Sequence, residues 1–208
     1  MSMPIIGILG GIGSGKSSVV RQVTEFQLQI IDADRIGHEL LGDDDVLREL
    51  HSNFDSSVFD SAGYVIRPKL AEFVFGETAK HQSALQSLNQ ILHPAIRRET
   101  AIQIKQASED ADAIIIDAAL LLEAGWADPC DVLVYIDTPE NERIARVQAN
   151  RNWSADELRK REQAQLPLDE KRAQSDYVID NSGSIANAAQ QMTEILRQII
   201  AGAAPRPH

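Results

Sequence analysis

The sequence is poor in cysteine, in basic residues and in long apolar runs, and each shortage excludes a class of protein. Cys130 is the single cysteine, which excludes an internal disulfide and a cysteine-based zinc cluster and suits a reducing, cytoplasmic location. The 208 residues carry 20 Lys and Arg against 31 Asp and Glu, and this net charge of −11 disfavours general nucleic-acid binding. No run approaches about 18 apolar residues, and the sequence begins without a signal-peptide pattern, so we expect no membrane span and no secretion signal.

Short apolar runs rich in β-branched residues alternate with longer stretches of helical pattern. Strands are expected at 4–9, 28–31, 113–117, 132–137 and 177–180. Helices are expected at 15–25, 34–42, 45–54, 67–76, 80–108, 139–150, 154–164 and 184–201. This alternation predicts an α/β fold with a five-stranded parallel sheet that carries helices on both faces. With 208 residues, 43% of them hydrophobic, the chain is long enough to form one such core. We expect a monomer or a small homo-oligomer.

Two stretches are longer than a crossover between neighbouring strands requires. Residues 35–112 are expected to form a helical insertion, and residues 143–172 a second excursion from the core. The core of this single domain would then comprise residues 1–34, 113–142 and 173–201. Residues 143–172 contain eight basic and five acidic residues, and 8 − 5 gives a local charge of +3 in an acidic chain. We therefore interpret this second excursion as a basic lid.

A glycine-rich stretch directly after the first expected strand matches the phosphate-loop pattern in full. The pattern Gly10-x-x-x-x-Gly15-Lys16-Ser17 has a strand before it and a helix after it, which is the context that this motif requires. Glycine lets backbone N–H groups turn inward around phosphate oxygens, and the helix N-terminus adds a positive dipole. Lys16 is expected to bridge the β- and γ-phosphates, and the Ser17 hydroxyl to bind Mg²⁺. The alternative is a glycine-rich turn with an incidental Lys-Ser pair.

The loop predicts a bound nucleoside triphosphate. Its expected ligands are Gly11, Ile12, Gly13, Ser14, Gly15, Lys16, Ser17 and Ser18. The guanine-reading Asn/Thr-Lys-x-Asp signature is absent from the sequence, which favours ATP over GTP. A nucleotide-dependent switch that signals to a protein partner would be expected to carry that signature or a partner-binding patch, and neither is visible.

Carboxylates follow the second and third expected strands, at the edge where ligands bind in open α/β sheets. Asp32 and Asp34 are two residues apart, so on an extended chain both could face one side and one could take a proton from an acceptor hydroxyl. Asp34 could equally cap the next helix. Asp117 could assist Mg²⁺ binding or simply cap the turn after its strand. The residues alone leave these alternatives open.

A His-Pro pair lies within the long helical stretch of the insertion. His93 stands alone, and a lone histidine is more often a structural residue than a ligand. Pro94 fits the first turn of a helix that begins there. The residues alone leave both interpretations of His93 open, with the structural one the more common.

The chain resembles the dephospho-coenzyme A kinase family from Pro4 to about Leu196. The motifs that carry the resemblance are GGIGSGKS (10–17), IDAD (31–34), Arg67-x-x-Leu70 with Val74-Phe75, LNQILHP (88–94), LLLE (120–123), Gln165, Glu170-Lys171 and SDYVIDNSG (175–183). Many folds share a phosphate loop. The His-Pro, Leu-Leu-x-Glu and Asp-Tyr-Val-Ile-Asp-Asn motifs in this order are specific.

The resemblance implies a kinase that transfers the γ-phosphoryl group of ATP to the 3′-hydroxyl of the dephospho-CoA ribose, the last step of coenzyme A biosynthesis. Asp34 would be the carboxylate that faces this hydroxyl, with Lys16 and Arg146 as further catalytic residues. Arg146 and Arg151 would close over the phosphates, and Asn181 would contact the adenine. The dephospho-CoA pocket would be lined by His93, Arg97, Leu121 and Glu123.

The chain departs from the family pattern at two places that bear on the site. Ala119 stands where the family usually has proline before Leu-Leu-x-Glu. Asn150 stands where the family usually has a lid arginine, and we expect the adjacent Arg151 to take that role. The alternative within the same fold is another small-molecule kinase, acting on a nucleoside, a nucleotide or a shikimate-like alcohol.

Overall fold

Five short strands pair in parallel to form one sheet in the computed structural model, which describes residues 3–76 and 78–202. The strands are β1 (Ile5–Gly10), β2 (Leu28–Asp32), β3 (Ala113–Asp117), β4 (Val132–Asp137) and β5 (Tyr177–Asp180). They lie in the order β2-β3-β1-β4-β5, and each neighbouring pair is parallel. The predicted α/β class and the five-stranded parallel sheet are therefore confirmed. Because parallel strands all end at one edge, the residues after them are brought together there.

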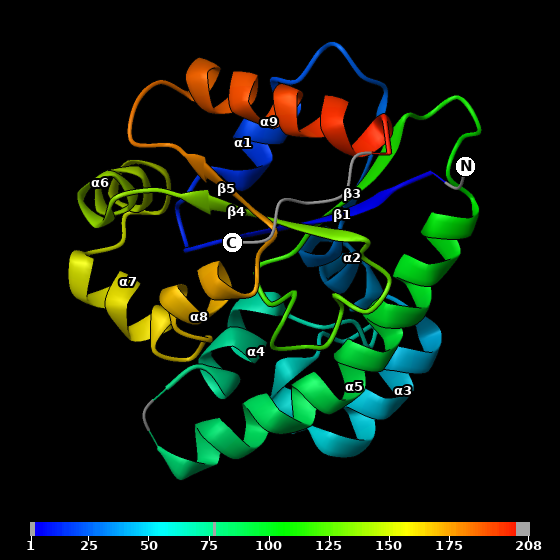
Figure 1. Ribbon diagram of the computed structural model, residues 1–208. Helices are drawn as coiled ribbons and strands as arrows, with labels where there is room; N and C mark the ends of the chain where they lie inside the picture. The colour runs from blue at the N-terminus through cyan, green and yellow to red at the C-terminus, as the bar shows by residue number, and fades with distance from the viewer. Residues whose placement is uncertain (1–2, 77, 203–208) are drawn as a thin grey trace. The chain divides into compact units, whose positions relative to one another are not determined.

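One face of the sheet is covered by α1 (Lys16–Arg21) and α9 (Ile185–Ile200), which pack against each other (Figure 1). Alternate residues of the strands point to this face, among them the fully buried Ile8 and Val134. Helix α9 adds Met192 and Leu196, which are four residues apart and so lie on one side of the helix. This apolar core fixes the position of the edge at which the strands end.

Three helices lie between β4 and β5 in the sequence: α6 (Glu140–Arg151), α7 (Ala155–Glu162) and α8 (Leu168–Ala173). The first two correspond to predicted helices. The third was not predicted, because six residues are too few to display an apolar period. Helix α8 starts after Pro167 and contacts β1 and β4.

Residues Ala33–Lys105 form a second unit, and the described residues up to Asp32 and from Gln106 onward form the first. The second unit contains α2 (Ala33–Leu40), α3 (Asp44–Asn53), a 3-10 turn (Ser56–Val58), α4 (Arg67–Val74) and α5 (Ala79–Lys105). Helix α5 contacts the other three helices, around a core that includes Leu50, Leu70 and Leu88. The expected insertion at 35–112 ends later than this unit, because residues 106–112 group with the first unit.

Pro94 lies inside α5, which runs without a break from Ala79 to Lys105. The interpretation that Pro94 opens a helix is therefore wrong. Proline has no N–H, so the carbonyl of Gln90 lacks its usual helical partner. Burial of the flanking Ile91 and Ala95 in the core of the second unit stabilises the helix across this position.

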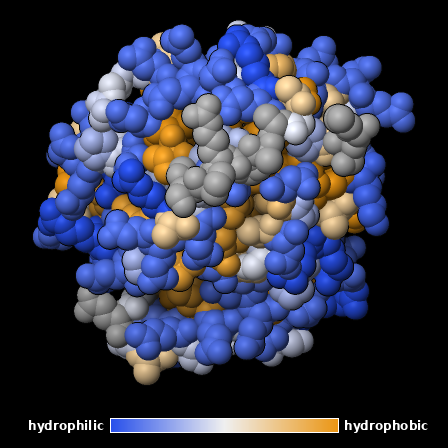
Figure 2. Space-filling model, viewed as in Figure 1, coloured by the Kyte–Doolittle hydropathy of each residue, from blue (hydrophilic) through white to orange (hydrophobic). Residues whose placement is uncertain are grey.

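The helices of the described residues are all too short or too polar to span a membrane. The face of the molecule in Figure 2 is largely hydrophilic, in keeping with a sequence in which 25% of the residues are charged. Large hydrophobic side chains that are nevertheless exposed are those of Tyr64, Phe75 and Ile102.

Gly7 in β1 leaves no room for a side chain. A Cβ at this position would lie 2.6 Å from Leu121 Cδ2, 2.7 Å from Leu133 Cδ2 and 2.9 Å from Cys130 Sγ. We predict that Gly7→Ala lowers the free energy of unfolding by about 1–3 kcal/mol, because overpacking forces neighbouring side chains off their rotamers. Urea denaturation followed by circular dichroism measures this change.

Gly183→Ala is the matched control for this substitution. The nearest atom to a Cβ at Gly183 would be Asn187 Nδ2, at 3.9 Å, which is an ordinary contact. We expect the control to change the free energy of unfolding by less than about 0.5 kcal/mol. Equal losses in the two variants would show that the crowding at Gly7 is not the cause.

Candidate functional site

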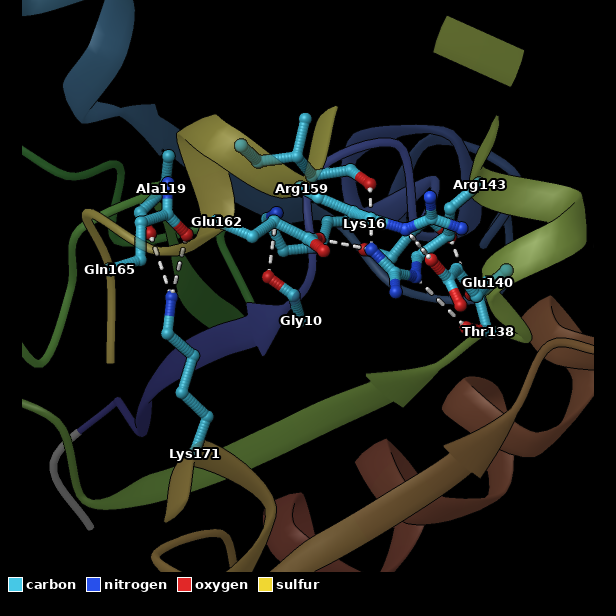
Figure 3. A network of polar contacts seen from close by, with 12 residues as sticks. Gly10, Lys16, Ala119, Thr138, Glu140, Arg143, Arg159, Glu162, Gln165 and Lys171 are labelled. Atoms are coloured by element: carbon cyan, nitrogen blue, oxygen red, sulfur yellow. Dashed lines mark hydrogen bonds and ion pairs between the residues drawn. The ribbon is translucent and has the colours of Figure 1, made fainter. Parts of the chain in front are cut away.

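The loop between β1 and α1 turns through glycines with left-handed backbone. Gly13 has φ 77° and Gly15 has φ 84°, a region that other residues rarely adopt. Gly15 is also the N-cap of α1, so the helix begins where the loop ends. Lys16 reaches back, and its Nζ lies 3.4 Å from the carbonyl oxygen of Gly10 (Figure 3). The loop therefore has the strand–loop–helix geometry that the phosphate-loop motif requires.

Ser17 of α1 and Asp117 of β3 lie side by side at the carboxyl edge of the sheet. The Ser17 hydroxyl donates a hydrogen bond to Asp117 Oδ2 across 100 residues of sequence. Asp117 is buried and pairs in register with Asp32, the last residue of β2. A hydroxyl and a carboxylate are oxygen donors that suit Mg²⁺, which commonly takes only one or two protein ligands beside phosphate oxygens and water. No cluster of three or more His, Cys, Asp or Glu side chains able to hold a metal ion occurs in the described residues.

Three side chains donate hydrogen bonds to the carbonyl oxygen of Ser14. The donors are Asn181 Nδ2 at 2.8 Å, Thr138 Oγ1 at 2.9 Å and Arg146 Nη1 at 3.0 Å. Thr138 follows β4, Asn181 follows β5, and Arg146 belongs to α6. Arg146 and Asn181, which the sequence analysis names as nucleotide ligands, thus both contact the loop itself. Their contacts with phosphate and adenine stay predictions.

Arg143 also contacts the loop, although the sequence analysis does not name it as a ligand. Its buried side chain forms an ion pair with Glu162 of α7. Its Nε donates to the carbonyl of Thr138 at 3.2 Å, and its Nη1 to the carbonyl of Ile12 at 3.5 Å. One signal could have found it: Arg143 precedes Arg146 by three residues, so the two share a face of the helix.

The basic residues of the 143–172 excursion are mostly paired with carboxylates. Besides Arg143–Glu162, ion pairs join Arg146 to Glu142, Arg159 to Glu140 and Asp156, Arg161 to Glu157, Lys171 to Glu123, and Arg172 to Asp137. Arg151 ends α6, with its guanidinium carbon 4.9 Å from the centroid of the Trp153 ring, and Arg161 lies 4.0 Å from the same ring. Because most of these charges are compensated, the local excess of +3 is not a continuous positive surface. The phosphate contact expected for Arg151 stays a prediction.

Lys171 of α8 is a buried charge that joins the Leu-Leu-x-Glu turn to the segment before α8. Its side chain is 1% exposed, and its Nζ lies 2.7 Å from Glu123 Oε1. The same Nζ donates to Gln165 Oε1 at 3.0 Å and to the carbonyl of Ala119 at 3.3 Å (Figure 3). Glu123 Oε1 also accepts a hydrogen bond from Leu166 N–H at 3.0 Å. Five groups therefore share one network: those of Ala119 and Glu123 in the turn, and those of Gln165, Leu166 and Lys171 in and before α8.

Two residues expected in the acceptor pocket point into the first unit. Leu121 is fully buried. Glu123 uses Oε1 for Lys171, while its Oε2 is buried without a hydrogen-bond partner among the described residues. The network uses the backbone carbonyl of Ala119, so the alanine that replaces the family's proline still accepts this bond. Contact of Leu121 and Glu123 with an acceptor stays a prediction.

Asp34 lies in the first turn of α2, which begins at Ala33. The expectation that Asp32 and Asp34 face one side of an extended chain is therefore wrong, because the strand ends at Asp32. Asp34 lies inside the helix rather than at a cap position, and its carboxylate stands near the helix N-terminus, where the dipole favours negative charge. The role of Asp34 toward an acceptor stays a prediction.

His93 and Arg97 lie one turn apart on α5 of the second unit. Partial burial, and to a smaller extent the charge of Arg97, lowers the pKa of His93 from its ordinary value of 6.5. This shift favours the neutral form of the imidazole. A neutral imidazole can donate a hydrogen bond from one ring nitrogen and accept one at the other.

The surroundings of Cys130 disfavour ionisation of its thiol. Burial raises the pKa of its thiol to about 12, and the charges of Asp131 and Asp128 contribute to the shift. The reactive form of cysteine is the thiolate, which is not populated at that pKa.

Comparison with known proteins points to one family. The model of the family described as dephospho-CoA kinase matches residues 4–187. A dephospho-CoA kinase of Carboxydothermus hydrogenoformans is 38% identical over 198 residues, which cover 94% of each chain. A dephospho-CoA kinase of Thermobifida fusca is 34% identical over 195 residues, covering 93% of this chain and 95% of the relative.

Solved structures show the same fold. A protein of Thermus thermophilus superposes with a TM-score of 0.76 at 27% identity, over 96% of this chain and 99% of its own. A dephospho-CoA kinase of Campylobacter jejuni gives a TM-score of 0.70 at 21% identity, over 96% and 98% of the two chains. A shikimate kinase of Acinetobacter baumannii shares the fold, with a TM-score of 0.52 at 15% identity. The match covers 99% of this chain and 97% of the kinase.

Removal of the Lys171 charge should be costly for stability. We predict that Lys171→Met lowers the free energy of unfolding by about 3–5 kcal/mol, because the carboxylate of Glu123 stays buried without its cation. Urea denaturation of the purified variant measures the loss.

Arg172→Met is the matched control. Arg172 is the next residue along the chain and forms an ion pair with Asp137, but its side chain is 55% exposed and that of Asp137 is 39% exposed. We expect a loss of less than about 1 kcal/mol, because water screens this pair. A similar loss in both variants would contradict the assignment of Lys171 as a buried, compensated charge.

The pKa of His93 should be measurable by NMR titration of the imidazole. We predict a pKa below 6.5, and only a partial rise toward 6.5 in Arg97→Gln, since burial is the larger cause. The depressed pKa means that the unfolded chain binds this proton more readily, so stability is lost as the pH falls below 6.5 through the folded-state pKa. A pKa above 6.5, or a full return to 6.5 in the variant, would contradict this account.

Proposed function

This chain belongs to the dephospho-CoA kinase family, and on that premise we propose that it transfers the γ-phosphoryl group of ATP to the 3′-hydroxyl of the dephospho-CoA ribose. This reaction is the last step of coenzyme A biosynthesis. The observation that carries the proposal is the pairing of a complete phosphate loop with the Ser17–Asp117 contact, in a chain that matches the family over residues 4–187. The kinase class follows from the family, and the residue roles below are our inference.

The phosphate loop would bind ATP through its backbone. The N–H groups of Gly13 and of residues 15–18 would face the phosphate oxygens, whereas the Ser14 N–H donates to the Gly11 carbonyl at 3.1 Å. Lys16 would lie between the β- and γ-phosphates. Ser17 and Asp117 would hold Mg²⁺, which neutralises charge on the transferred group when it is bound. Their hydroxyl and carboxylate oxygens are already adjacent, so little reorganisation of the side chains is needed.

Asp34 would orient the acceptor hydroxyl and take its proton. Phosphoryl transfer depends on placement and charge neutralisation more than on covalent chemistry, so one carboxylate near the acceptor suffices. His93, Arg97, Leu121 and Glu123 would line the dephospho-CoA pocket. A neutral His93 could form a hydrogen bond with the acceptor without adding charge.

Arg146 would place positive charge next to the loop. Its Nη1 lies 3.1 Å from the position of a Cβ on Gly15, so the guanidinium is in contact with the loop. Arg151 would add a second charge from the end of α6, in place of the family arginine missing at Asn150. Asn181 would contact the adenine. Closure of this segment would also keep water from accepting the phosphoryl group.

The composition of the chain bears on its location and its partners. We propose a cytoplasmic enzyme, in keeping with the single cysteine of the sequence. We propose that it acts as a monomer or a small homo-oligomer. The net charge of −11 disfavours a nucleic-acid partner.

The first experiment mixes purified protein with Mg-ATP and dephospho-CoA and follows ADP and CoA by chromatography. Adenosine, AMP and shikimate run in parallel as acceptors. The proposal would be supported if CoA forms from dephospho-CoA and Mg-ATP, the other acceptors are not phosphorylated, and Lys16→Ala abolishes the reaction. ADP formed with another acceptor instead would favour a different small-molecule kinase, and no ADP at all would leave a nucleotide-binding protein without kinase activity.

Asp34→Asn should separate catalysis from ATP binding. We predict a loss of turnover of about 100-fold or more, the usual contribution of a general base, with ATP affinity largely retained. Steady-state kinetics and calorimetric titration of ATP measure the two quantities. Asp44→Asn is the control, because Asp44 also stands in the first turn of a helix in the second unit. Near-normal turnover in Asp34→Asn would remove the assignment of this base.

A further inference from the structure

The carbonyl oxygen of Ser14 is the most heavily hydrogen-bonded atom of the phosphate loop. It accepts from Thr138, Arg146 and Asn181 at 2.8–3.0 Å. Asn181 is fully buried and Thr138 is 6% exposed, so two of these donors are shielded from water. Asn181 Nδ2 also lies 3.3 Å from Thr138 Oγ1, which links them into one network. A carbonyl usually needs one or two partners, so three convergent donors call for a reason.

The reason lies in the geometry of the peptide bond that joins Ser14 to Gly15. A trans peptide is planar, so its C=O and N–H groups point in opposite directions. Donors that hold the Ser14 carbonyl on one side therefore hold the Gly15 N–H on the other. That N–H is one of the groups that a phosphate loop turns toward its ligand. In the described part of the chain, the hydrogen bonds present use neither the Gly13 N–H nor the Gly15 N–H.

Glycine makes such an external restraint necessary. Gly15 has φ 84° and no side chain, so the peptide before it has little local resistance to rotation. A Cβ at Gly15 would lie 3.1 Å from Arg146 Nη1 and 3.4 Å from Asn181 Nδ2, which shows how closely the donors approach the loop. The carbonyl of Ile12 stands in the same relation to Gly13, which follows it in the chain. It accepts a hydrogen bond from Arg143 Nη1 at 3.5 Å. The same relation between a held carbonyl and a following glycine N–H thus occurs twice.

We propose that Thr138, Arg146 and Asn181 form a carbonyl clamp that presets the Gly15 N–H toward the phosphates. The clamp residues are positioning residues, because they act on the nucleotide through the Ser14 peptide. The proposal rests on the proposed function only in that the loop binds the phosphates of ATP. In the clamp, the contribution of Asn181 to binding does not depend on the adenine base of the nucleotide. If Asn181 contacted adenine instead, its contribution would be lost for a ligand without that base.

Thr138 offers a matched pair of variants. Thr138→Val has the same shape without the hydroxyl, and Thr138→Ser retains a donor. Loss of one neutral hydrogen bond corresponds to about a 2- to 10-fold change in an equilibrium constant. We expect Thr138→Val to weaken ATP binding by this factor and Thr138→Ser to recover most of it. In kinetics, the KM for ATP should rise while the KM for dephospho-CoA stays the same.

Thr193→Val controls for a general loss of stability. Thr193 on α9 donates its hydroxyl to the carbonyl of Ala189 at 2.8 Å, so the variant also loses one hydroxyl bond within the first unit. We expect thermal unfolding to shift in both valine variants but ATP affinity to fall in Thr138→Val alone. Equal affinity losses in the two would mean that destabilisation, rather than the clamp, is the cause.

Asn181→Ala distinguishes the clamp from an adenine contact. Calorimetric titration with ATP and with inorganic tripolyphosphate, which has no base, gives the two affinities. The clamp predicts the same fold loss for both ligands. If the variant loses affinity for ATP but not for tripolyphosphate, Asn181 is not part of the clamp. If it loses affinity for neither ligand, the clamp itself is overturned.

This test separates failure of the clamp from failure of the proposed function. Wild-type protein that binds ATP but forms no CoA would refute the proposed acceptor and leave the clamp open to the same titrations. If Asn181→Ala does not fold, the comparison of Thr138→Val with Thr138→Ser still tests the clamp. Equal ATP affinity in Thr138→Val and Thr138→Ser would then overturn the proposal.

Discussion

The close approach of α6 to the glycine-rich loop is the constraint on which the site depends. A Cβ at Gly13 would lie 2.9 Å from Val147 Cγ1 and 3.0 Å from the carbonyl oxygen of Arg143, and one at Gly11 would lie 2.9 Å from Arg143 Nη1. Glycine is therefore required where the loop packs against α6. It is also required for the left-handed backbone and for access of phosphate. The loop and α6 consequently form one structural element of the site, although about 130 residues separate them.

Pairing distributes the charge at the carboxyl edge of the sheet. Arg143 and Lys171 are buried and each is matched by a carboxylate, so neither presents a bare charge to an approaching nucleotide. Arg143 is also held by backbone carbonyls of the loop and of Thr138. Under the proposed function, attraction of phosphates would then fall to Lys16, to the oriented N–H groups and to Arg146. An electrostatic field built this way is local and directional, unlike that of a broad basic surface.

The sequence predicted the strands and the phosphate loop because both are recorded in consecutive residues. The run AIIID of β3 is buried along its length, and its β-branched composition is visible without knowledge of its neighbours. The sequence failed where local pattern is weak or ambiguous. Helix α8 is too short to display a period, Pro94 lies inside a helix that tertiary packing stabilises, and Asp34 is helical where an extended chain was considered. In each case the surrounding structure decided.

The sequence by itself determined the α/β class, the order of elements, the phosphate loop and the family, since apolar periodicity and motif spacing are properties of neighbouring residues. The tertiary structure alone decided which polar groups meet. Asn181 and Ser14 are 167 residues apart, and Arg146 and Ser14 are 132 apart. Their contact follows from strand order in a parallel sheet, which brings the ends of β1, β4 and β5 to one edge. No local pattern encodes a partner at that distance, because packing of the whole core selects it.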